Sequence, residues 1–344
     1  MRTTFRSATE LATDLLLSSG MPDSPARRTA WALVAADAWG RASHGLLRLP
    51  FYLARLAEGG ADPRAELTRV SDRGPTLAFD GGNGLGHWQL WEAAEHGVSR
   101  ARQSGLAAVS VGNSGHCGAL GLYVLPAVDA GMVGLVFSHG PAVIPPWGGH
   151  SPITSTSPLS MGFPARPRPL IVDLACSAVA RGKIAEAASA GTELPEGWAL
   201  DRAGRPTTDP AAALQGMLAP MGGAKGFALA LAVEALTAAV VGPHLSTQVA
   251  DPLDPGANGQ AQRIAHLVIV LDPQAFDVDG RGAARLEELA LSVEAAGGRL
   301  PGAEHPLPGD LGPNHEVTVP DRVCGQLVAE ATARGITVPP DWSR

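Results

Sequence analysis

From about residue 70 onward, short apolar runs alternate with longer helical patterns, and this alternation restricts the possible folds more than any other feature of the chain. Apolar runs of strand length predict buried strands, whereas the longer amphipathic stretches predict helices. Strands and helices that alternate in this way pack as layers, so the sequence predicts an α/β core. We expect strands at 106–111, 132–137, 170–174 and 265–271, and helices at 87–104, 177–190, 223–241 and 282–296.

The first 60 residues predict three helices. The segment Ser7–Glu10 has the form of a capping box and is followed by apolar spacing that stops at Gly20. Ser24 is the candidate N-cap of a second helix over 25–39, and a third helix is expected over 50–58. The sequence therefore predicts a helical unit at the N-terminal end of the chain.

These patterns divide the chain into three predicted units. A helical N-terminal unit covers residues 1–70, and an α/β core that binds cofactor and substrate covers 71–300. Proline and glycine are frequent after residue 300, before a short helix expected near 322–334. We expect this tail, 301–344, to pack near the N-terminal unit.

Charge and cysteine content exclude several classes of protein. The net charge is −7 and the isoelectric point is about 5.8, whereas a surface that binds nucleic acid is usually basic. Three cysteines without zinc spacing favour reduced thiols in the cytoplasm and no metal site. Residues 1–10 lack the apolar core of a signal peptide, and the apolar stretch 227–241 is short and interrupted by Glu234. We interpret that stretch as a buried helix, not a membrane span.

The usual fingerprints of nucleotide binding are missing. No GxGxxG follows a strand, and the nearest glycine cluster, Gly82–Gly86, has the wrong spacing and reads as a turn. No Walker loop, HExxH or GxSxG occurs either. A nucleotide site must therefore be argued from other segments.

The segment Ser43–Arg48 is the first that could carry chemistry. An imidazole at His44 can exchange a proton near neutral pH, and the Arg48 guanidinium can hold a carboxylate by two parallel hydrogen bonds. This pairing suits a 2-oxo or 2-hydroxy acid. The alternative is a capping serine beside a surface histidine and arginine.

The second segment, Asn113–Gly121, follows a predicted strand and is expected to lead into a helix that ends near Gly131. Loops at the carboxyl ends of strands often build sites, and glycines bring backbone N–H groups close to a ligand. The alternative is a glycine-rich turn with a capping asparagine. His116 and Cys117 have no further ligands at a plausible spacing for a metal.

The third segment, Gly222–Phe227, places glycines and Lys225 before a long apolar helix. A helix N-terminus with a lysine could hold a phosphate or pyrophosphate. An ordinary helix start with a solvated lysine is the other interpretation. A proline-, glycine- and aspartate-rich stretch at 251–262 predicts an exposed loop.

Taken in order, these segments resemble the malate/L-lactate dehydrogenase-2 family, which includes hydroxyacid dehydrogenases and cyclic-imine reductases. The resemblance runs nearly continuously from about residue 5 to 305. Besides the three segments above, it rests on Pro146–Gly149, Asp173–Ala175, Gly197–Asp201 and Pro206–Pro210.

The resemblance implies an NAD(P)-dependent oxidoreductase with a non-Rossmann α/β fold, usually found as a homodimer. It implies that hydride passes between nicotinamide and a small 2-oxo or 2-hydroxy acid of the malate, lactate or sulfolactate type. A reductase of a cyclic imino acid, such as piperideine- or pyrroline-2-carboxylate, is the alternative. An inactive relative that binds a nucleotide is a lesser one. NAD and NADP both remain open as the cofactor.

The resemblance also implies site residues. His116 corresponds to the family's acid/base, and the catalytic set further contains Ser43, His44 and Arg48. The residues expected to line the substrate pocket are Arg48, Tyr52, Gly140 and Pro141. Those expected to contact the cofactor are His44, Gly118, Leu120, Gly121, Thr156, Asp173, Leu174, Ala175, Cys176 and Lys225.

Two positions differ from many members. Some hydroxyacid members have a Ser-Asp pair where this chain has Gly140-Pro141, and Thr156-Ser157-Pro158 stands in place of Thr-Asn-Pro. An apolar, uncharged wall at Gly140-Pro141 mildly disfavours a second carboxylate on the substrate.

Overall fold

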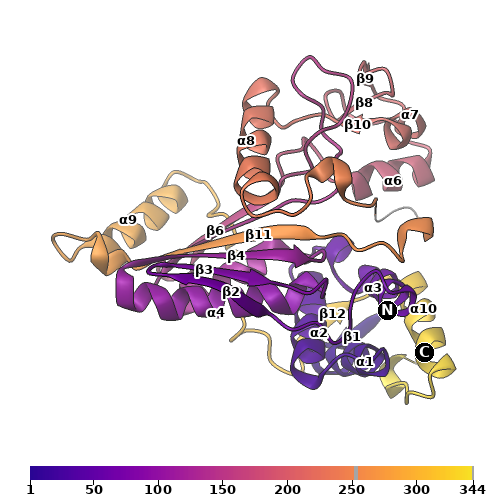
Figure 1. The fold of residues 1–344 in the computed structure, drawn as a ribbon, viewed down its shortest axis with the longest axis horizontal. Coiled ribbons are helices and arrows are strands. Elements are labelled where there is room, and N and C mark those ends of the chain that lie inside the picture. The colour runs from indigo at the N-terminus through magenta and orange to yellow at the C-terminus, as the bar shows by residue number, and fades with distance from the viewer. Residues whose placement is uncertain (252–254, 343–344) are drawn as a thin grey trace.

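A seven-stranded mixed sheet lies at the centre of the computed structural model, which describes residues 1–251 and 255–342 (Figure 1). Strands β3 and β4 pair in parallel, and each other neighbouring pair in this sheet is antiparallel. In spatial order the strands are β2 (Thr68–Arg73), β3 (Thr76–Asp80), β4 (Leu106–Ser114), β11 (Ile264–Leu271), β5 (Val133–Ser138), β6 (Leu159–Phe163) and β7 (Leu170–Leu174). The predicted α/β layering is confirmed.

Strand β11 lies between β4 and β5, although it follows them by more than a hundred residues in the sequence. Val268 of β11 faces Val109 of β4 on one side and Val136 of β5 on the other, and all three are buried. Leu267 and Ile269 of β11 pack on the opposite face, against a second hydrophobic core. A strand that is covered on both faces is a nearly unbroken apolar run in the sequence. The strand predicted at 265–271 is therefore confirmed, and the structure makes it a central one.

Helix α4 (Gly86–Ser104) covers one face of the sheet, where it packs against β4 and β11 (Figure 1). It connects β3 to β4, and two adjacent parallel strands need a crossover of this kind. Its buried face includes Leu90, Ala94 and Ala101. This helix begins one residue before its predicted start.

The N-terminal helices are α1 (Phe5–Ser18), α2 (Asp23–Ala38) and α3 (Leu49–Glu58), with short turns η1 (Ala42–His44) and η2 (Leu46–Arg48) before α3. The capping predictions were wrong. Thr4, not Ser7, caps α1, because its hydroxyl accepts the Ser7 N–H at 3.1 Å. Helix α2 begins at Asp23 after Pro22, so Ser24 lies inside it.

The two ends of the chain lie together (Figure 1). Strand β1 (Arg2–Thr4) pairs with β12 (Glu316–Thr318), and α10 (Asp321–Ala333) follows. The Thr3 hydroxyl donates to Asp341 at 2.6 Å. One hydrophobic core contains residues from the N-terminal helices, the sheet and the tail. Because this core is shared by all three predicted units, the boundaries near residues 70 and 300 stay a prediction.

A lobe on the other side of the sheet contains a three-stranded sheet and three helices (Figure 1). Its elements are α6 (Arg181–Ala190), β8 (Ala199–Leu200), β9 (Pro206–Thr207), α7 (Pro210–Gln215), β10 (Met217–Leu218) and α8 (Ala224–Glu234). The helix predicted from residue 177 begins only at Arg181. Ser177 forms a β-bridge with Pro220 instead, and Ala178 donates to the Ala219 carbonyl at 2.8 Å.

The helix predicted over 223–241 is divided. Helix α8 ends at Glu234 and continues as one π turn, η4 (Ala235–Ala239). The prediction that this stretch is buried was wrong, because Leu236 is 40% exposed and Val240 is 78% exposed. Within residues 1–251 and 255–342, no helix has the length and apolar character needed to cross a membrane.

Two other segments differ from their predictions. The single helix expected to end near Gly131 is a turn, η3 (Leu120–Val124), followed by α5 (Leu125–Asp129), because Pro126 starts a new helix. The helix predicted over 282–296 is confirmed as α9 (Gly282–Ala295), which projects from the end of the sheet (Figure 1). Within the loop predicted at 251–262, residues 252–254 lie outside the described part, and Gln262 is buried, not exposed. Short turns complete the chain at η5 (Ser246–Gln248), η6 (Pro255–Ala257), η7 (Pro273–Ala275) and η8 (Pro340–Trp342).

Candidate active site

His116 lies just beyond the end of β4, where its imidazole meets helix α3. Its Nδ1 is 2.7 Å from the Tyr52 hydroxyl and accepts the Gly118 N–H at 3.3 Å. Its backbone N–H donates to Gln262 Oε1 at 3.1 Å. The ring is thus fixed by Nδ1 and by its own backbone. No residue in the described part of the chain hydrogen-bonds its Nε2, which leaves that nitrogen for a ligand.

Helix α3 and its N-cap residue, Arg48, supply three polar side chains at helical spacing. Arg48, Tyr52 and Arg55 are separated by four and three residues, so they share one face of the helix. Arg55 is buried and donates to the Gly60 and Gln260 carbonyls at 2.9 and 2.6 Å. This face therefore orders the chain that leads to Gln262, as well as His116 itself.

The loop before α3 brings His44 to the same place. The His44 and His116 rings lie nearly parallel, with centroids 6.0 Å apart. The Ser43 hydroxyl is 3.0 Å from His44 Nδ1, and Arg48 Nε donates to the Ser43 carbonyl at 3.0 Å. Because its Nε is used in this way, Arg48 retains its two terminal NH₂ groups for an anionic ligand. The surface-residue interpretation of this segment therefore does not fit the geometry.

His266 and Ser138 support the loop that carries His116. His266 of β11 contacts the Gly115 carbonyl through Nε2 at 3.2 Å and the Ser138 hydroxyl through Nδ1 at 2.8 Å. Through Ser138 this support reaches the end of β5, which leads directly to Gly140 and Pro141. Two hydrogen bonds through His266 thus link Gly115, the residue before His116, to Ser138, two residues before Gly140.

Gly118 cannot be replaced by a larger residue without moving the site. Its φ is +72°, and an added Cβ would lie 2.9 Å from His87 Nε2. His87 in turn packs edge-on against Tyr52, with ring centroids 4.8 Å apart. The glycine-rich segment is therefore a close approach between backbone and buried rings, not only a turn.

Burial makes the imidazoles of the site uncharged at neutral pH. It lowers the pKa of His116 well below 6.5, and the nearby Arg48 charge lowers it further. Burial, with Arg48 and Arg41, lowers the pKa of His44 to about 4. The pKa of His87 falls to about 3 for the same main reason. The Arg48 guanidinium therefore faces neutral rings, a setting that favours an anionic substrate.

The segments predicted to contact the cofactor form one continuous strip. The Cys176 N–H donates to the Thr156 carbonyl at 2.8 Å, and the Met221 N–H donates to the Cys176 carbonyl at 2.7 Å. The Gly121 backbone contacts Asp173, where an added Cβ would lie 3.0 Å from the carboxylate. Leu120, Leu174 and Ala175 stand within the same strip by their positions in the chain.

Lys225 lies at the end of this strip, exposed in the first turn of α8. That helix begins without a side-chain cap and has no acidic residue in its first turn. The amides of a first turn lack partners within the helix, and its dipole favours negative charge. The donor set there fits the phosphates of a nicotinamide dinucleotide.

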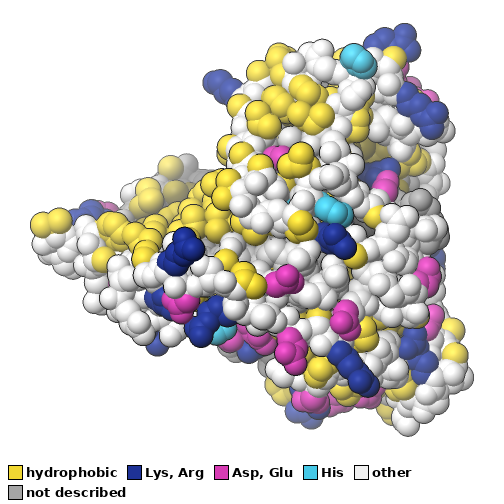
Figure 2. Space-filling view, viewed as in Figure 1, with side chains coloured by type: hydrophobic (Ala, Val, Ile, Leu, Met, Phe, Trp, Pro, Cys, Tyr) yellow, Lys and Arg dark blue, Asp and Glu magenta, His cyan; other side chains and the backbone are white. Residues whose placement is uncertain are grey.

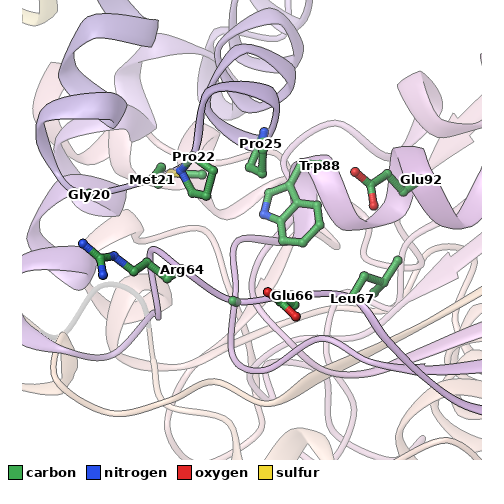
Figure 3. A pocket seen from close by; sticks show the side chains of 10 residues that line it. Gly20, Met21, Pro22, Pro25, Arg64, Glu66, Leu67, Trp88 and Glu92 are labelled. Carbon is green, nitrogen blue, oxygen red and sulfur yellow. The ribbon is translucent and has the colours of Figure 1, made fainter.

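A hollow in the surface lies away from these residues. A hollow of about 600 Å³ opens between the α1–α2 turn, the 64–67 segment and α4 (Figure 3). Trp88 points into it from α4, with Arg64, Glu66 and Glu92 around its rim (Figure 3). None of the predicted site residues lines it.

Several residues of the site were not predicted from the sequence. The most important are Asp37, Arg55, His87, Gln262 and His266. His266 carries a signal that could have been used, since a histidine inside an otherwise apolar central strand needs hydrogen-bond partners. Asp37 sits on the buried face of α2 and gives a similar signal. The sequence alone contains no signal that would identify Arg55 or Gln262 as site residues.

The chain is similar to known proteins over almost its whole length. Residues 3–337 match the family model described as malate/L-lactate dehydrogenase. The chain is 40% identical to the (2R)-3-sulfolactate dehydrogenase (NADP(+)) of Chromohalobacter salexigens, over 96% of this chain and 98% of that protein. It is 35% identical to the Delta(1)-pyrroline-2-carboxylate/Delta(1)-piperideine-2-carboxylate reductase of Pseudomonas putida, over 88% of this chain and 89% of that protein.

Two solved structures have the same fold. The sulfolactate dehydrogenase of Methanocaldococcus jannaschii superposes with a TM-score of 0.90 and 29% identity, over 98% of each chain. The delta1-piperideine-2-carboxylate reductase of Pseudomonas syringae superposes with a TM-score of 0.88 and 30% identity, over 96% of this chain and all of that one. The similarity thus covers both hydroxyacid dehydrogenases and a cyclic-imine reductase.

Proposed function

The chain belongs to the malate/L-lactate dehydrogenase family of NAD(P)-dependent oxidoreductases, and from that premise we propose that His116 exchanges the proton of the reaction at Nε2. One observation carries the proposal. The His116 imidazole is fixed at Nδ1 by Tyr52 and Gly118, which leaves Nε2 beside the His44 ring and near the Arg48 charge.

The bound nicotinamide supplies or accepts the hydride at the 2-carbon of the substrate. In reduction, the oxygen on that carbon takes one proton, and His116 Nε2 stands as its donor. In oxidation, the same nitrogen takes the hydroxyl proton. Thr156, Cys176 and Lys225 are the residues we propose for holding the dinucleotide, along the strip that runs to the start of α8.

Arg48 binds the substrate carboxylate in this proposal. Its Nε is occupied by the Ser43 carbonyl, so the two terminal nitrogens can donate to the two carboxylate oxygens. Such a two-point contact fixes the orientation of the 2-carbon relative to the hydride. Ser43 and His44 complete the wall beside it.

We propose a small 2-oxo/2-hydroxy acid of the malate, lactate or sulfolactate type as the substrate. The 40% identity to a sulfolactate dehydrogenase over almost the whole chain supports this class. A cyclic imino acid is the second candidate, supported by the uncharged Gly140-Pro141 wall and by the similarity to pyrroline- and piperideine-2-carboxylate reductases. An inactive nucleotide-binding relative is the least supported, because His44, Arg48, His116 and Lys225 are all present.

The experiment that tests this function measures the absorbance of reduced nicotinamide. NADH and NADPH are each offered with sulfopyruvate, oxaloacetate, pyruvate or Δ1-piperideine-2-carboxylate. Oxidation with a keto acid supports the first candidate, and oxidation with the imine alone supports the second. His116→Ala should lower kcat by about 10²–10⁴-fold, the usual scale of a lost acid/base. A variant with unchanged kcat would remove His116 from this role.

We also propose that the protein works as a homodimer in the cytoplasm. Hydrophobic side chains gather over the sheet and over α8 (Figure 2). A groove of about 520 Å³ there is lined by Val70, Leu236 and Val240, which are 64%, 40% and 78% exposed. Contiguous apolar surface of this kind is typical of a subunit interface. Sedimentation equilibrium would give the mass directly. A monomer at micromolar concentration would contradict the proposal.

A further inference from the structure

Two antiparallel segments pair with each other at both ends of a short gap. At one end the Ser138 N–H donates to the Pro158 carbonyl at 3.2 Å, and at the other end the Val143 N–H donates to the Thr154 carbonyl at 2.8 Å. Between these pairs, no backbone hydrogen bond joins the two segments in the part of the chain that the structure describes. A ladder that is interrupted in this way leaves amide groups that need other partners.

The gap contains residues to which the proposed function gives roles. One segment carries Gly140 and Pro141 of the predicted pocket wall, and the other carries Thr156, which we propose for holding the dinucleotide. A Cβ added to Gly140 would lie 4.0 Å from the Cβ of Ser155, so the two segments approach to ordinary contact distance there. The spacing of the two segments across the gap should therefore set the distance between the pocket wall and the cofactor.

Glu234 connects the two sides of this gap. It is buried at the end of α8, where its Oε1 accepts the Ser246 N–H at 2.8 Å and its Oε2 accepts the Ser246 hydroxyl at 2.5 Å. The Ser155 N–H also hydrogen-bonds to this carboxylate. The Ser246 carbonyl in turn accepts the Ala142 N–H at 3.0 Å. Amides on both sides of the gap are thus satisfied through Glu234, one directly and the other through Ser246.

Hydrogen bonds alone hold this carboxyl group. Burial raises the pKa of Glu234 above its usual range, and the hydrogen bonds from Ser246 and Ser155 oppose the rise. No basic side chain within residues 1–251 and 255–342 forms an ion pair with it. An apolar side chain would fill the same place without the cost of burying a carboxyl group, so its oxygens must be needed as acceptors. The next residue begins the π turn η4, and such turns are frequent at functional sites.

We propose that Glu234 is a positioning residue, which holds the pocket wall at Gly140-Pro141 at a fixed distance from the cofactor strip at Thr156. It acts through the two serines and not through contact with a ligand. Because α8 also carries Lys225 in its first turn, one helix then positions the dinucleotide phosphates at one end and the pocket wall at the other. This inference deepens the proposed function and rests on it for the identity of the two sides of the gap.

Hydrogen exchange resolved to single amides tests this position without any reaction. In cofactor-free Glu234→Ala, the Ala142 and Ser246 amides should exchange about tenfold faster than in the wild type, the scale of one buried hydrogen bond. The Val143 amide, which is bonded to Thr154, should keep its rate. Unchanged rates at Ala142 and Ser246 would overturn the proposal, whatever substrate the enzyme uses.

Further variants separate this role from the general stability of α8. Thr237→Val removes a buried hydroxyl of the π turn, which donates to the Val233 carbonyl at 2.7 Å, and should leave exchange at Ala142 as in the wild type. Glu234→Gln keeps an oxygen for the Ser246 N–H and should restore most of the protection. Equal effects of Thr237→Val and Glu234→Ala would show that only the helix is weakened and would overturn the role of Glu234. If Glu234→Ala did not fold, as judged by circular dichroism, Glu234→Asp, whose carboxyl group is one methylene shorter, should show the same faster exchange.

Kinetics show whether the position of the wall matters to the substrate. With the acid or imine that the enzyme reduces fastest, Glu234→Ala should raise KM about tenfold while kcat changes less. The dissociation constant of the reduced dinucleotide should change less than KM, because the Cys176 N–H still holds the Thr156 carbonyl. Faster exchange with unchanged KM and kcat would overturn the positioning role. A wild-type protein that reduces none of the compounds would count against the proposed function, whereas the exchange rates would still decide the contact.

Discussion

Asp37 supports the loop that carries Ser43, His44 and Arg48, and its replacement by asparagine should stabilise the protein at alkaline pH. The Asp37 carboxylate is buried on α2, where Oδ2 accepts the Leu46 N–H at 2.8 Å. Oδ1 has no hydrogen-bond partner among the residues that the structure describes. Burial raises the pKa of this carboxyl from near 3.8 to about 7, although the Leu46 bond opposes the rise.

The sign of the effect follows from this raised pKa. The folded protein binds the proton more tightly than the unfolded chain, so the contribution to stability is greatest below about pH 4 and is lost as the pH rises through about 7. Each pKa unit corresponds to about 1.4 kcal/mol, which gives a total loss of about 4 kcal/mol by pH 8. About 2–3 kcal/mol of this loss should develop between pH 5 and 8.

Asp37→Asn keeps an oxygen for the Leu46 N–H but cannot ionise. The difference in free energy of unfolding between Asp37→Asn and the wild type should therefore shift by about 2–3 kcal/mol in favour of the variant between pH 5 and 8. The measurement is urea unfolding of cofactor-free protein at one fixed concentration, because association would otherwise shift the result. Asp14→Asn, on the exposed side of α1, is the control and should run parallel to the wild type. If the free energies of unfolding of Asp37→Asn and the wild type changed equally with pH, the reasoning would be refuted.

Three further predictions concern the reaction. Arg48→Ala should raise KM for the carboxylate substrate much more than for its amide, and equal effects on both would exclude the carboxylate contact. The pKa of His116 lies well below 6.5, so kcat/KM for oxidation should stay constant from about pH 6.5 to 8.5. Over the same range kcat/KM for reduction should fall about tenfold per pH unit. A change of kcat/KM for oxidation near neutral pH would contradict this. Lys225→Ala should weaken NADH or NADPH binding, measured by fluorescence, by about 1–2 kcal/mol, and removal of the phosphates from the ligand should abolish the difference.

The sequence predicts the elements of this fold better than their arrangement. The strand at 170–174 has its predicted ends, and its apolar run begins directly after Pro169. Strand β2, with the sequence TRVSDR, was not predicted because an edge strand that faces solvent needs no apolar alternation. The place of β11 between β4 and β5 is a long-range pairing that no local pattern records.

The candidate site shows the same division. Motif spacing identified His44, Arg48 and His116, because polar residues between glycines stand out locally. The bond between Tyr52 and His116 joins residues 64 positions apart and depends on how α3 packs beside the end of β4. The role of Gln262 likewise depends on its burial, which nothing in the polar segment around it reveals.

The late position of β11 in the chain also constrains synthesis on the ribosome. Until residues 264–271 leave the exit tunnel, β4 and β5 each have an unpaired edge, although they were made more than a hundred residues earlier. Unpaired edges of nascent strands are sites of aggregation. Any stall or truncation before residue 264 would leave two half-sheets without the strand that joins them, and a chaperone would have to shield them throughout that interval.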